Sequence, residues 1–246
     1  MGNGRVRAML AATLCLATAL ASASASAGYD PREKARTNVD VGSGIAWLLH
    51  DEINDGLETA GFSELENPYL PFSISVLLHH GRLAFGLGVL ALSQLGQEAE
   101  RDRMRGEVTG TSMALRLGYE LIALESFSVT PLIGVGFSIA EVAFYSKDER
   151  DFGEIIEQQN GGVYFQSTGL LLEAALRLEY RIAIKERPGS RFDFAIGLAG
   201  GFQYTPAVFS WTHSVHGDVT GAPDFGVTGP YVVANIGMAF SRFFGE

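Results

Sequence analysis

The sequence predicts an all-β fold, namely a closed, antiparallel, up-and-down transmembrane β-barrel of eight strands. Three observations support this class. Bulky apolar residues alternate with small or polar residues along most of the chain, which is the period of a β-strand. No stretch after Ala27 contains eighteen consecutive apolar residues, so a membrane-spanning helix is not expected. The connections between the alternating segments are long and short in turn, as expected for an up-and-down barrel.

Residues 1–27 have the features of a cleaved secretory signal peptide. Arg5 and Arg7 precede an apolar stretch, and Ala25-Ser26-Ala27 offers a cleavage site of small residues. We therefore expect residues 28–246 to form a single outer-membrane barrel domain. The only cysteine, Cys15, lies in the signal segment, which excludes disulfides, thiol catalysis and cysteine metal sites from the mature chain.

Eight alternating segments are predicted as strands, and most exceed the roughly 9–11 residues that a tilted strand needs to cross a bilayer. They are Val39–Leu49, Phe72–His79, Leu83–Gln94, Val108–Ile122, Phe127–Phe144, Val163–Tyr180, Phe192–Tyr204 and Tyr231–Phe244. In Val108–Ile122, for example, Leu115 and Leu117 share one face while Arg116 and Gly118 share the other. Pro131 falls inside a segment, and we expect it at a bulge or a weak spot near one rim of the barrel.

The composition of the two faces predicts which one meets lipid. One face is rich in glycine, alanine and serine and contains no lysine, whereas the exterior of a soluble barrel would be rich in lysine and glutamate. Small residues suit a narrow lumen, so the bulky apolar face is predicted to face lipid. Outward aromatic residues gather near the strand ends and predict two interfacial girdles. They are Trp47, Phe72, Phe202 and Tyr204 at one end, and Phe85, Tyr119, Phe127, Tyr180, Phe192 and Phe244 at the other.

The long connections are predicted to be extracellular and the short ones periplasmic. The long connections are His50–Pro71, Leu95–Glu107, Tyr145–Gly162 and Thr205–Pro230, and the short ones are His80–Arg82, Ala123–Ser126 and Arg181–Arg191. A hairpin within Thr205–Pro230 is an alternative that would raise the strand number to ten. The long connections are strongly acidic. This charge, with a net charge of -10 for the whole chain, argues against nucleic acid as a partner.

The chain resembles the small eight-stranded outer-membrane β-barrels of Gram-negative bacteria, such as the barrels of outer membrane proteins A, X and W. The resemblance covers Val39 to Phe244 and includes a last strand with Ile236, Met238 and Phe240 on one face before Phe243-Phe244. It implies export to the outer membrane, contact with outer-membrane lipid and lipopolysaccharide, and a last strand recognised by the barrel assembly machinery. We expect a monomer.

Charged residues on the inward parity of the predicted strands are the first candidates for a functional site. They are Asp40, Arg116, Glu120, Glu173, Arg177, Glu179 and Asp193. Because buried charges are tolerated only when they are paired, these residues predict a salt-bridge network that fills the lumen. A gate or selectivity site is the alternative. The pairs Gly86/Gly88 and Gly134/Gly136 also face inward and are predicted to make room in the lumen rather than to bind a nucleotide.

The histidines give a weaker indication of chemistry. His213, His216 and Asp218 share one predicted outer loop, but closeness in sequence does not define a catalytic triad, and His213-x-x-His216 lacks a clear third metal ligand. We predict no metal site, no cofactor and no enzymatic activity. The expected function is structural or adhesive, with acidic loops that bind lipopolysaccharide or a partner through divalent cations. The alternatives are a narrow channel for small or hydrophobic solutes, an outer-rim hydrolase or lipid-modifying enzyme, and a soluble periplasmic lipocalin-like carrier.

Overall fold

The computed structural model describes residues 33–49, 51–95, 99–101, 104–146, 163–213, 217–219 and 225–243. The predicted signal peptide, residues 1–27, lies outside these ranges. Within them the chain is almost entirely antiparallel β-structure with one helix, α2 (Asp51–Thr59). In this part of the chain, no helix is both long and apolar enough to cross a membrane.

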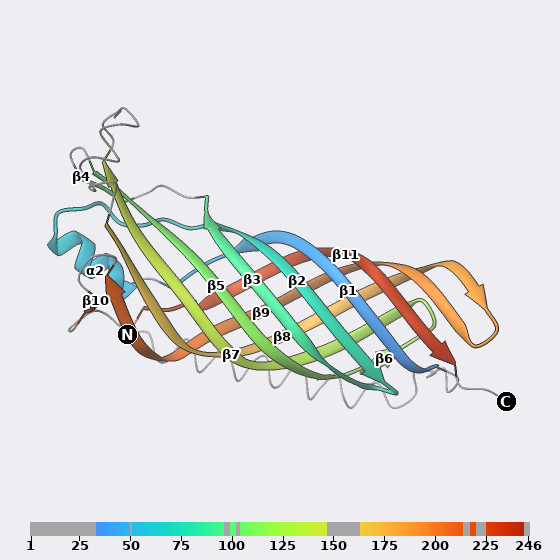
Figure 1. Ribbon diagram of the computed structural model, residues 1–246. Helices are drawn as coiled ribbons and strands as arrows, with labels where there is room; N and C mark the ends of the chain where they lie inside the picture. Colours follow the sequence, from blue (N-terminus) through green and yellow to red (C-terminus); the bar gives the residue numbers. More distant parts are fainter. Residues whose placement is uncertain are drawn as a thin grey trace, which may run out of the picture.

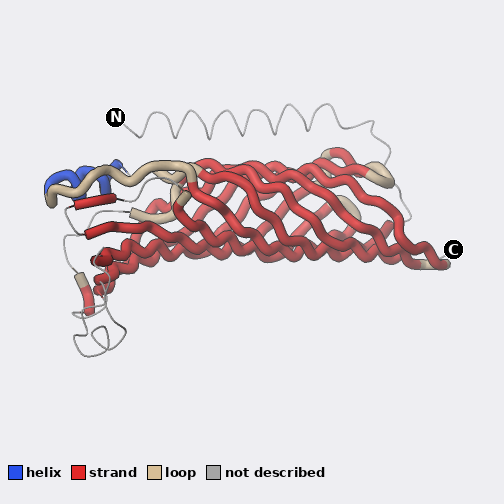
Figure 2. Tube along the Cα trace, turned by 90° about the horizontal axis from the view of Figure 1, so that it is seen from above, coloured by secondary structure: helices blue, strands red, loops and turns tan. Residues whose placement is uncertain are grey.

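Eight long strands pair antiparallel with their neighbours in chain order. They are β1 (Glu33–Ala46), β2 (Tyr69–His80), β3 (Leu83–Gln94), β5 (Met104–Tyr119), β7 (Phe127–Ser146), β8 (Val163–Arg187), β9 (Ser190–His213) and β11 (Gly229–Phe243). The last of these strands, β11, pairs with β1 as well as with β9, so the pairings run round in a ring. Figures 1 and 2 show these strands crossing the long axis of the molecule at a strong tilt.

The all-β, antiparallel ring predicted from the sequence is confirmed, but the number of strands differs. The described sheet has eleven strands, because β4 (Ala99–Arg101), β6 (Ile122–Ala123) and β10 (Gly217–Asp218) add short pairings to single neighbours. The alternative hairpin in the last long connection forms in part, since β9 continues to His213 and β10 turns back to pair with it. These short strands lengthen the edges of the ring and are not further members of it.

Several strands extend beyond the limits that were predicted from apolar alternation. Strand β1 begins at Glu33 instead of Val39, and the predicted turn Arg181–Arg191 is wrong, because β8 continues to Arg187 and β9 begins at Ser190. Main-chain hydrogen bonds between strands do not require apolar side chains, so the pairing continues into polar sequence. Only Pro188 and Gly189 remain as the turn, and Gly189 has a φ of 79° that favours glycine.

The two ends of the ring differ, and we call them the loop end and the turn end. The loop end carries α2, β4 and β10, which lie together at the left of Figure 1. The turn end carries Gly81-Arg82, residues 124–126 and the β8–β9 hairpin, which extends furthest to the right in Figure 1. Of the four predicted long connections, His50–Pro71 is largely described, whereas most of Tyr145–Gly162 lies outside the described residues.

Side chains alternate between the inside and the outside of the ring along most of the strands. In β2 every second residue is buried, including Ser73, Ser75 and His79, and the residues between them are exposed. Pro131 lies where the pairing of β5 with β7 stops, after Gly118 opposite Leu132, and the ladder resumes with β6 at Ile122 opposite Val129. Pro131 thus lies at a weak spot of the pairing near the turn end, while its pairing with Leu176 of β8 continues without a bulge.

Candidate functional site in the lumen

The inward charges predicted from strand parity lie inside the ring. Asp40, Glu120, Glu173, Arg177, Glu179 and Asp193 are buried, and the side chain of Arg116 is 10% exposed. They come from β1, β5, β8 and β9 and from the residue that follows β5.

A bidentate ion pair between Arg116 and Glu173 occupies the middle of the lumen. The guanidinium Nε and Nη2 of Arg116 donate to the two Glu173 carboxylate oxygens over 2.6 and 2.8 Å. The same carboxylate accepts from the Tyr231 hydroxyl at 2.7 Å and from the Gln203 amide at 3.3 Å. Charge-assisted, fork-like pairs of this kind are the strongest that side chains form.

Inward glycines make room for this ion pair. A Cβ placed at Gly88 would lie 2.1 Å from the Arg116 guanidinium carbon, and one at Gly134 would lie 2.9 Å from a Glu173 oxygen. Both glycines belong to Gly-x-Gly pairs that the sequence places on the lumen face. The small residues therefore create the space that the larger charged side chains fill, which supports the spatial interpretation over nucleotide binding.

A second cluster lies closer to the turn end and centres on Arg177. Its Nη1 donates to Asp40 Oδ2 at 2.8 Å, and its Nη2 donates to Glu179 Oε2 at 2.6 Å. Asn38 Nδ2 also donates to both Glu179 carboxylate oxygens, at 2.8 Å to Oε1 and 2.7 Å to Oε2. Arg181 lies 4.0 Å from the other Glu179 oxygen and donates to the main-chain oxygen of Leu124 at 2.8 Å.

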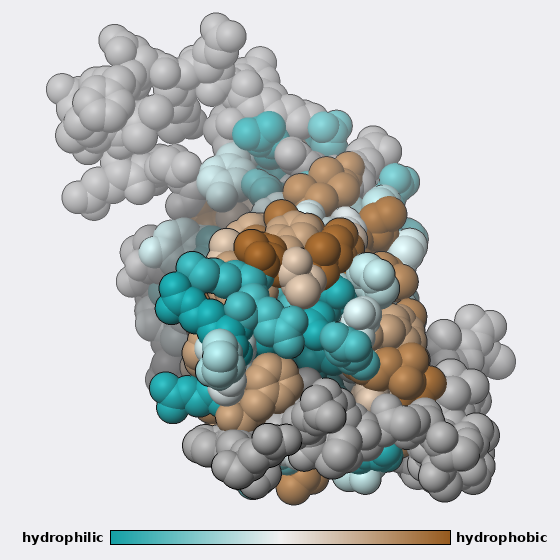
Figure 3. All heavy atoms as spheres, turned by 90° about the vertical axis from the view of Figure 1, so that its right-hand side faces the viewer, coloured by the Kyte–Doolittle hydropathy of each residue, from teal (hydrophilic) through white to brown (hydrophobic). Residues whose placement is uncertain are grey.

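A third group of contacts closes the turn end. Arg36 donates to Glu120, and the Nδ1 atom of His79 lies 3.3 Å from the same carboxylate. Arg191 donates to Asp193 at 2.6 Å and to the exposed Glu125 at 2.7 Å. Figure 3 looks onto this end, where hydrophilic residues gather at the centre and hydrophobic residues lie to the sides.

Four further residues, which were not predicted from the sequence, belong to the network: Arg36, His79, Arg181 and Arg191. All four are buried, and with them the described interior holds five arginines against five buried acids, so its formal charge balances. Arg36, Arg181 and Arg191 lie in strand extensions that had been assigned to a terminal segment or a turn. The parity of Asp40, Glu179 and Asp193, extended by two or four residues, is the signal that would have identified them.

The half of the lumen near the loop end is apolar. Ile53 and Leu57 of α2 pack inward with Leu48, Val108 and Phe225 in one hydrophobic cluster. Residues 225–228 fold back into the mouth of the ring and are held there by side-chain hydrogen bonds. Ser167 donates to the main-chain oxygen of Phe225 at 2.8 Å, and the Thr205 hydroxyl donates to that of Val227 at 3.1 Å.

The polar network and the apolar layer thus close the lumen in series. We call residues 225–228 the plug segment, since its Phe225 and Val227 side chains are 2% and 1% exposed. An open hollow of about 520 Å³ remains at the turn end, bordered by Glu125, Glu186 and Arg191 among others. Most polar atoms of the described lumen are paired, although Asp40 Oδ1 and Ser75 Oγ are buried without a hydrogen-bond partner.

The histidine loop is only partly described. His213 ends β9, and its ring packs at 4.9 Å against that of Phe165. Gly217 and Asp218 pair through the main chain with His213 and Thr212, whereas His216 lies outside the described residues. No group of three residues of the His, Cys, Asp or Glu types that could hold a metal ion occurs among the residues described.

Most of the predicted girdle residues lie on the outside of the ring. Trp47, Phe72, Phe85, Tyr119 and Tyr180 are exposed by 41–53%. Phe127, Phe192, Phe202 and Tyr204 are partly exposed, and Phe244 lies outside the described residues. Sequence parity therefore placed these aromatic rings on the outer wall in each case that the structure describes.

Comparison with known proteins gives a likeness in fold. No protein-family model matches the chain, and no curated protein matches it. The chain resembles small outer-membrane β-barrels. The attachment invasion locus protein of Yersinia pestis is 13% identical, with a TM-score of 0.45, over 85% of this chain and 99% of that one. A major outer membrane protein of Thermus thermophilus is 14% identical, with a TM-score of 0.44, over 84% and 98%. The outer membrane protease of Escherichia coli is 8% identical, with a TM-score of 0.31, over 89% and 99%.

Proposed function

We propose that the protein is a closed, non-enzymatic barrel of eight membrane-crossing strands in the outer membrane of a Gram-negative bacterium. In this proposal the loop end faces the outside of the cell and the turn end faces the periplasm. Because the lumen is filled, the protein acts through its loop end as a structural or adhesive component. The single observation that carries the proposal is the apolar outer wall.

The height of this wall matches the apolar thickness of a membrane. Along β1 and the residues after it, Val39, Val41, Ile45, Trp47 and Leu49 are each 41–48% exposed. Ten residues at about 3.3 Å each, tilted by about 40°, span about 25 Å, the height of the apolar band of outer-membrane barrels. A soluble carrier would lose solubility with such a surface, so the wall favours the membrane barrel over the lipocalin-like alternative.

The closed lumen favours a structural or adhesive role over a channel. Removing an ion from water into the apolar layer around Phe225 and Val227 is strongly unfavourable. Below that layer, Glu173 and Arg177 are already saturated by protein partners. A hydrophobic solute would in turn meet the ion pairs. The apolar layer therefore disfavours the passage of ions, and the ion pairs disfavour the passage of hydrophobic solutes.

The loop end offers acidic groups to the outside. Helix α2 buries Ile53 and Leu57, while Asp51, Asp55 and Glu58 are exposed. Carboxylates are hard oxygen ligands that divalent cations prefer, and lipopolysaccharide carries phosphates that the same cations bind. We therefore propose lipopolysaccharide, bridged by divalent cations, as a partner of this end.

Refolding tests the membrane proposal. Residues 28–246 should fold only with detergent or lipid, and the folded form should migrate differently on gels before and after boiling, since a closed ring has no free edge. In planar bilayers it should give no stepwise conductance. Recovery as a soluble protein without detergent would refute the membrane assignment, and regular single-channel steps would establish the channel instead.

A second experiment tests the loop end. The folded barrel should retain more lipopolysaccharide in calcium than in a chelator, and the variant D51N/D55N/E58Q should lose most of this difference. The control is Glu186→Gln, which removes an exposed acid at the turn end. Equal retention by all three proteins would exclude α2 as the contact.

A further inference from the structure

The outer surface of the turn end carries a cluster of cations on three neighbouring strands. Arg187 of β8 pairs with Ser190 of β9, and Ser190 pairs with Arg242 of β11. Directly opposed residues of antiparallel strands share a face, so these three side chains form one row. In the next row toward the loop end, Lys185 pairs with Phe192. We call Lys185, Arg187, Ser190 and Arg242 the cationic patch.

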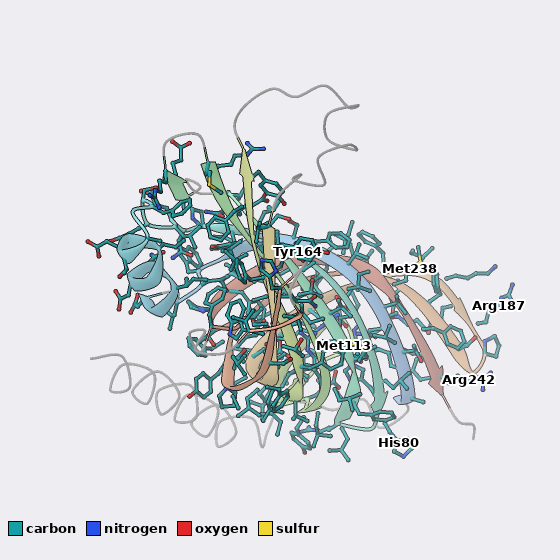
Figure 4. The ribbon with its side chains drawn as sticks, turned by 60° about the vertical axis from the view of Figure 1, so that its left-hand side comes forward. His80, Met113, Tyr164, Arg187, Met238 and Arg242 are labelled. Carbon is teal, nitrogen blue, oxygen red and sulfur yellow. The ribbon has the colours of Figure 1, made fainter. Side chains whose placement is uncertain are left out.

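Lys185 and Arg242 lie on the outward face, and Arg187 also borders the hollow at the turn end. Arg242 lies two residues from Phe240, which is 43% exposed on the outer wall, so the two share a side. Arg187 and Lys185 are also exposed. Figure 4 shows Arg187 and Arg242 together at this end of the barrel, with Met238 further along the wall.

Acids lie on the other side of this hairpin. Glu186 pairs across the strands with the buried Arg191 and therefore shares its inward face. Glu125 accepts a hydrogen bond from Arg191 at 2.7 Å. Within the described ranges, no ion pair joins Lys185, Arg187 or Arg242 to an acid. Among the residues that the structure describes, the three cations of the patch thus have no acidic partner.

The spacing of the three cations suits a single phosphate group. Arg187 and Arg242 are two strands apart, which is about 10 Å, and Lys185 is two residues from Arg187, which is about 7 Å. Their long side chains can converge over Ser190, whose hydroxyl is a further donor. Guanidinium groups are well shaped to hold phosphate oxygens in pairs of hydrogen bonds.

The patch also lies where a phospholipid phosphate would be. The row that contains Lys185 continues through Phe192 and Phe240, and Met238 beyond them is 56% exposed. The cations therefore border directly on the apolar wall. The three cations lie on one side of the barrel. The row that contains Arg187, Ser190 and Arg242 continues around the ring through Ala35, His80, Leu83 and Tyr119, none of which is a lysine or an arginine.

We propose that the cationic patch is a binding site for an anionic phospholipid of the inner leaflet. Its phosphate would sit among Lys185, Arg187, Ser190 and Arg242, and its acyl chains would lie along Phe240 and Met238. The proposal rests on the proposed function, since it requires the turn end to lie in the inner leaflet. It adds a lipid partner on the side opposite to the acidic loops.

Native mass spectrometry of the refolded barrel tests the site. Phosphatidylglycerol and phosphatidylcholine with identical acyl chains are offered to the protein in detergent, and bound lipid is counted. We expect one phosphatidylglycerol to be retained preferentially. Each of K185Q, R187Q and R242Q should weaken the retention of phosphatidylglycerol about fivefold. This factor corresponds to the attraction of about 1 kcal/mol that one cation contributes near an anionic lipid surface. The control R105Q removes an exposed arginine near the loop end and should bind as the unaltered protein does.

The outcomes separate this inference from the proposed function. Heat-dependent migration on gels confirms that each variant has folded, which is expected because all three side chains are exposed. A barrel that inserts into vesicles but binds both lipids equally, or that loses phosphatidylglycerol as readily in R105Q as in R242Q, would overturn the lipid site alone. A chain that does not insert at all would overturn the proposed function as well.

Discussion

Three neighbouring side chains together fix the carboxylate of Glu173. Its side chain is 0% exposed, and its oxygens accept from Arg116 twice, from Tyr231 and from Gln203. A carboxylate without such partners would be very costly to bury. The ion pair is therefore best understood as a way of filling the lumen with groups that satisfy one another.

Replacing Arg116 with alanine tests this view at the residue scale. The change leaves the Glu173 carboxylate without its main partner, and we expect a loss of about 3–5 kcal/mol in the free energy of unfolding. Urea unfolding in lipid or detergent measures it. The double variant R116A/E173Q should recover part of the loss, since the stranded charge is gone. A stable R116A that conducts ions would show that the pair is a gate.

Strand parity was sufficient to place single charged residues inside predicted strands. Asp40, Glu173 and Arg177 lie inward as parity requires. It failed for Arg36 and Arg191 because the strand limits had been drawn where the apolar pattern ends. Inside a barrel the wall is defined by main-chain pairing, so charged residues continue the strand wherever a partner inside can neutralise them.

At the scale of elements, the apolar layer near the loop end depends on segments that return to the ring from long connections. Helix α2 presents Ile53 and Leu57 four residues apart on one side, which its sequence alone suggests. The plug segment gives no periodic signal, because it is an irregular stretch fixed by contacts with Ser167 and Thr205. Such long-range contacts cannot be read from local sequence, and this layer was not predicted.

Truncation of Phe225 to alanine tests the plug segment. Phe225 is 2% exposed, so we expect a loss of about 3–5 kcal/mol in the free energy of unfolding, as for other buried phenylalanines. Conductance should stay absent, because the ion pairs below still close the lumen. The control is Phe209→Ala at a ring that is 66% exposed. Stepwise conductance in Phe225→Ala but not in Phe209→Ala would show that the plug segment alone keeps ions from passing through the lumen.

At the scale of the whole molecule, the protein inverts the usual distribution of polarity. Charged groups such as Arg177 and Glu179 are buried, while Leu115, Ile133 and Leu117 are 54–66% exposed. The alternation of residue types predicted this inversion, because the small face is rich in glycine, alanine and serine and contains no lysine. The offset between strands, which leaves the β8–β9 hairpin protruding at the turn end, follows from the barrel's stagger and could not be inferred from single segments.

The inversion predicts losses of different size for one substitution at two exposed leucines. Leu115 pairs with Leu87 and Val135, both exposed and apolar, so it lies well inside the outer wall. Leu115→Arg should lower the free energy of unfolding in lipid by about 2–4 kcal/mol, because a charge near the bilayer midplane is costly. Leu124→Arg, at a leucine 43% exposed beside the turn after β6, should cost about 0–1 kcal/mol. Denaturant unfolding in lipid vesicles compares the two, and equal, small losses would mean that water and not lipid surrounds this wall.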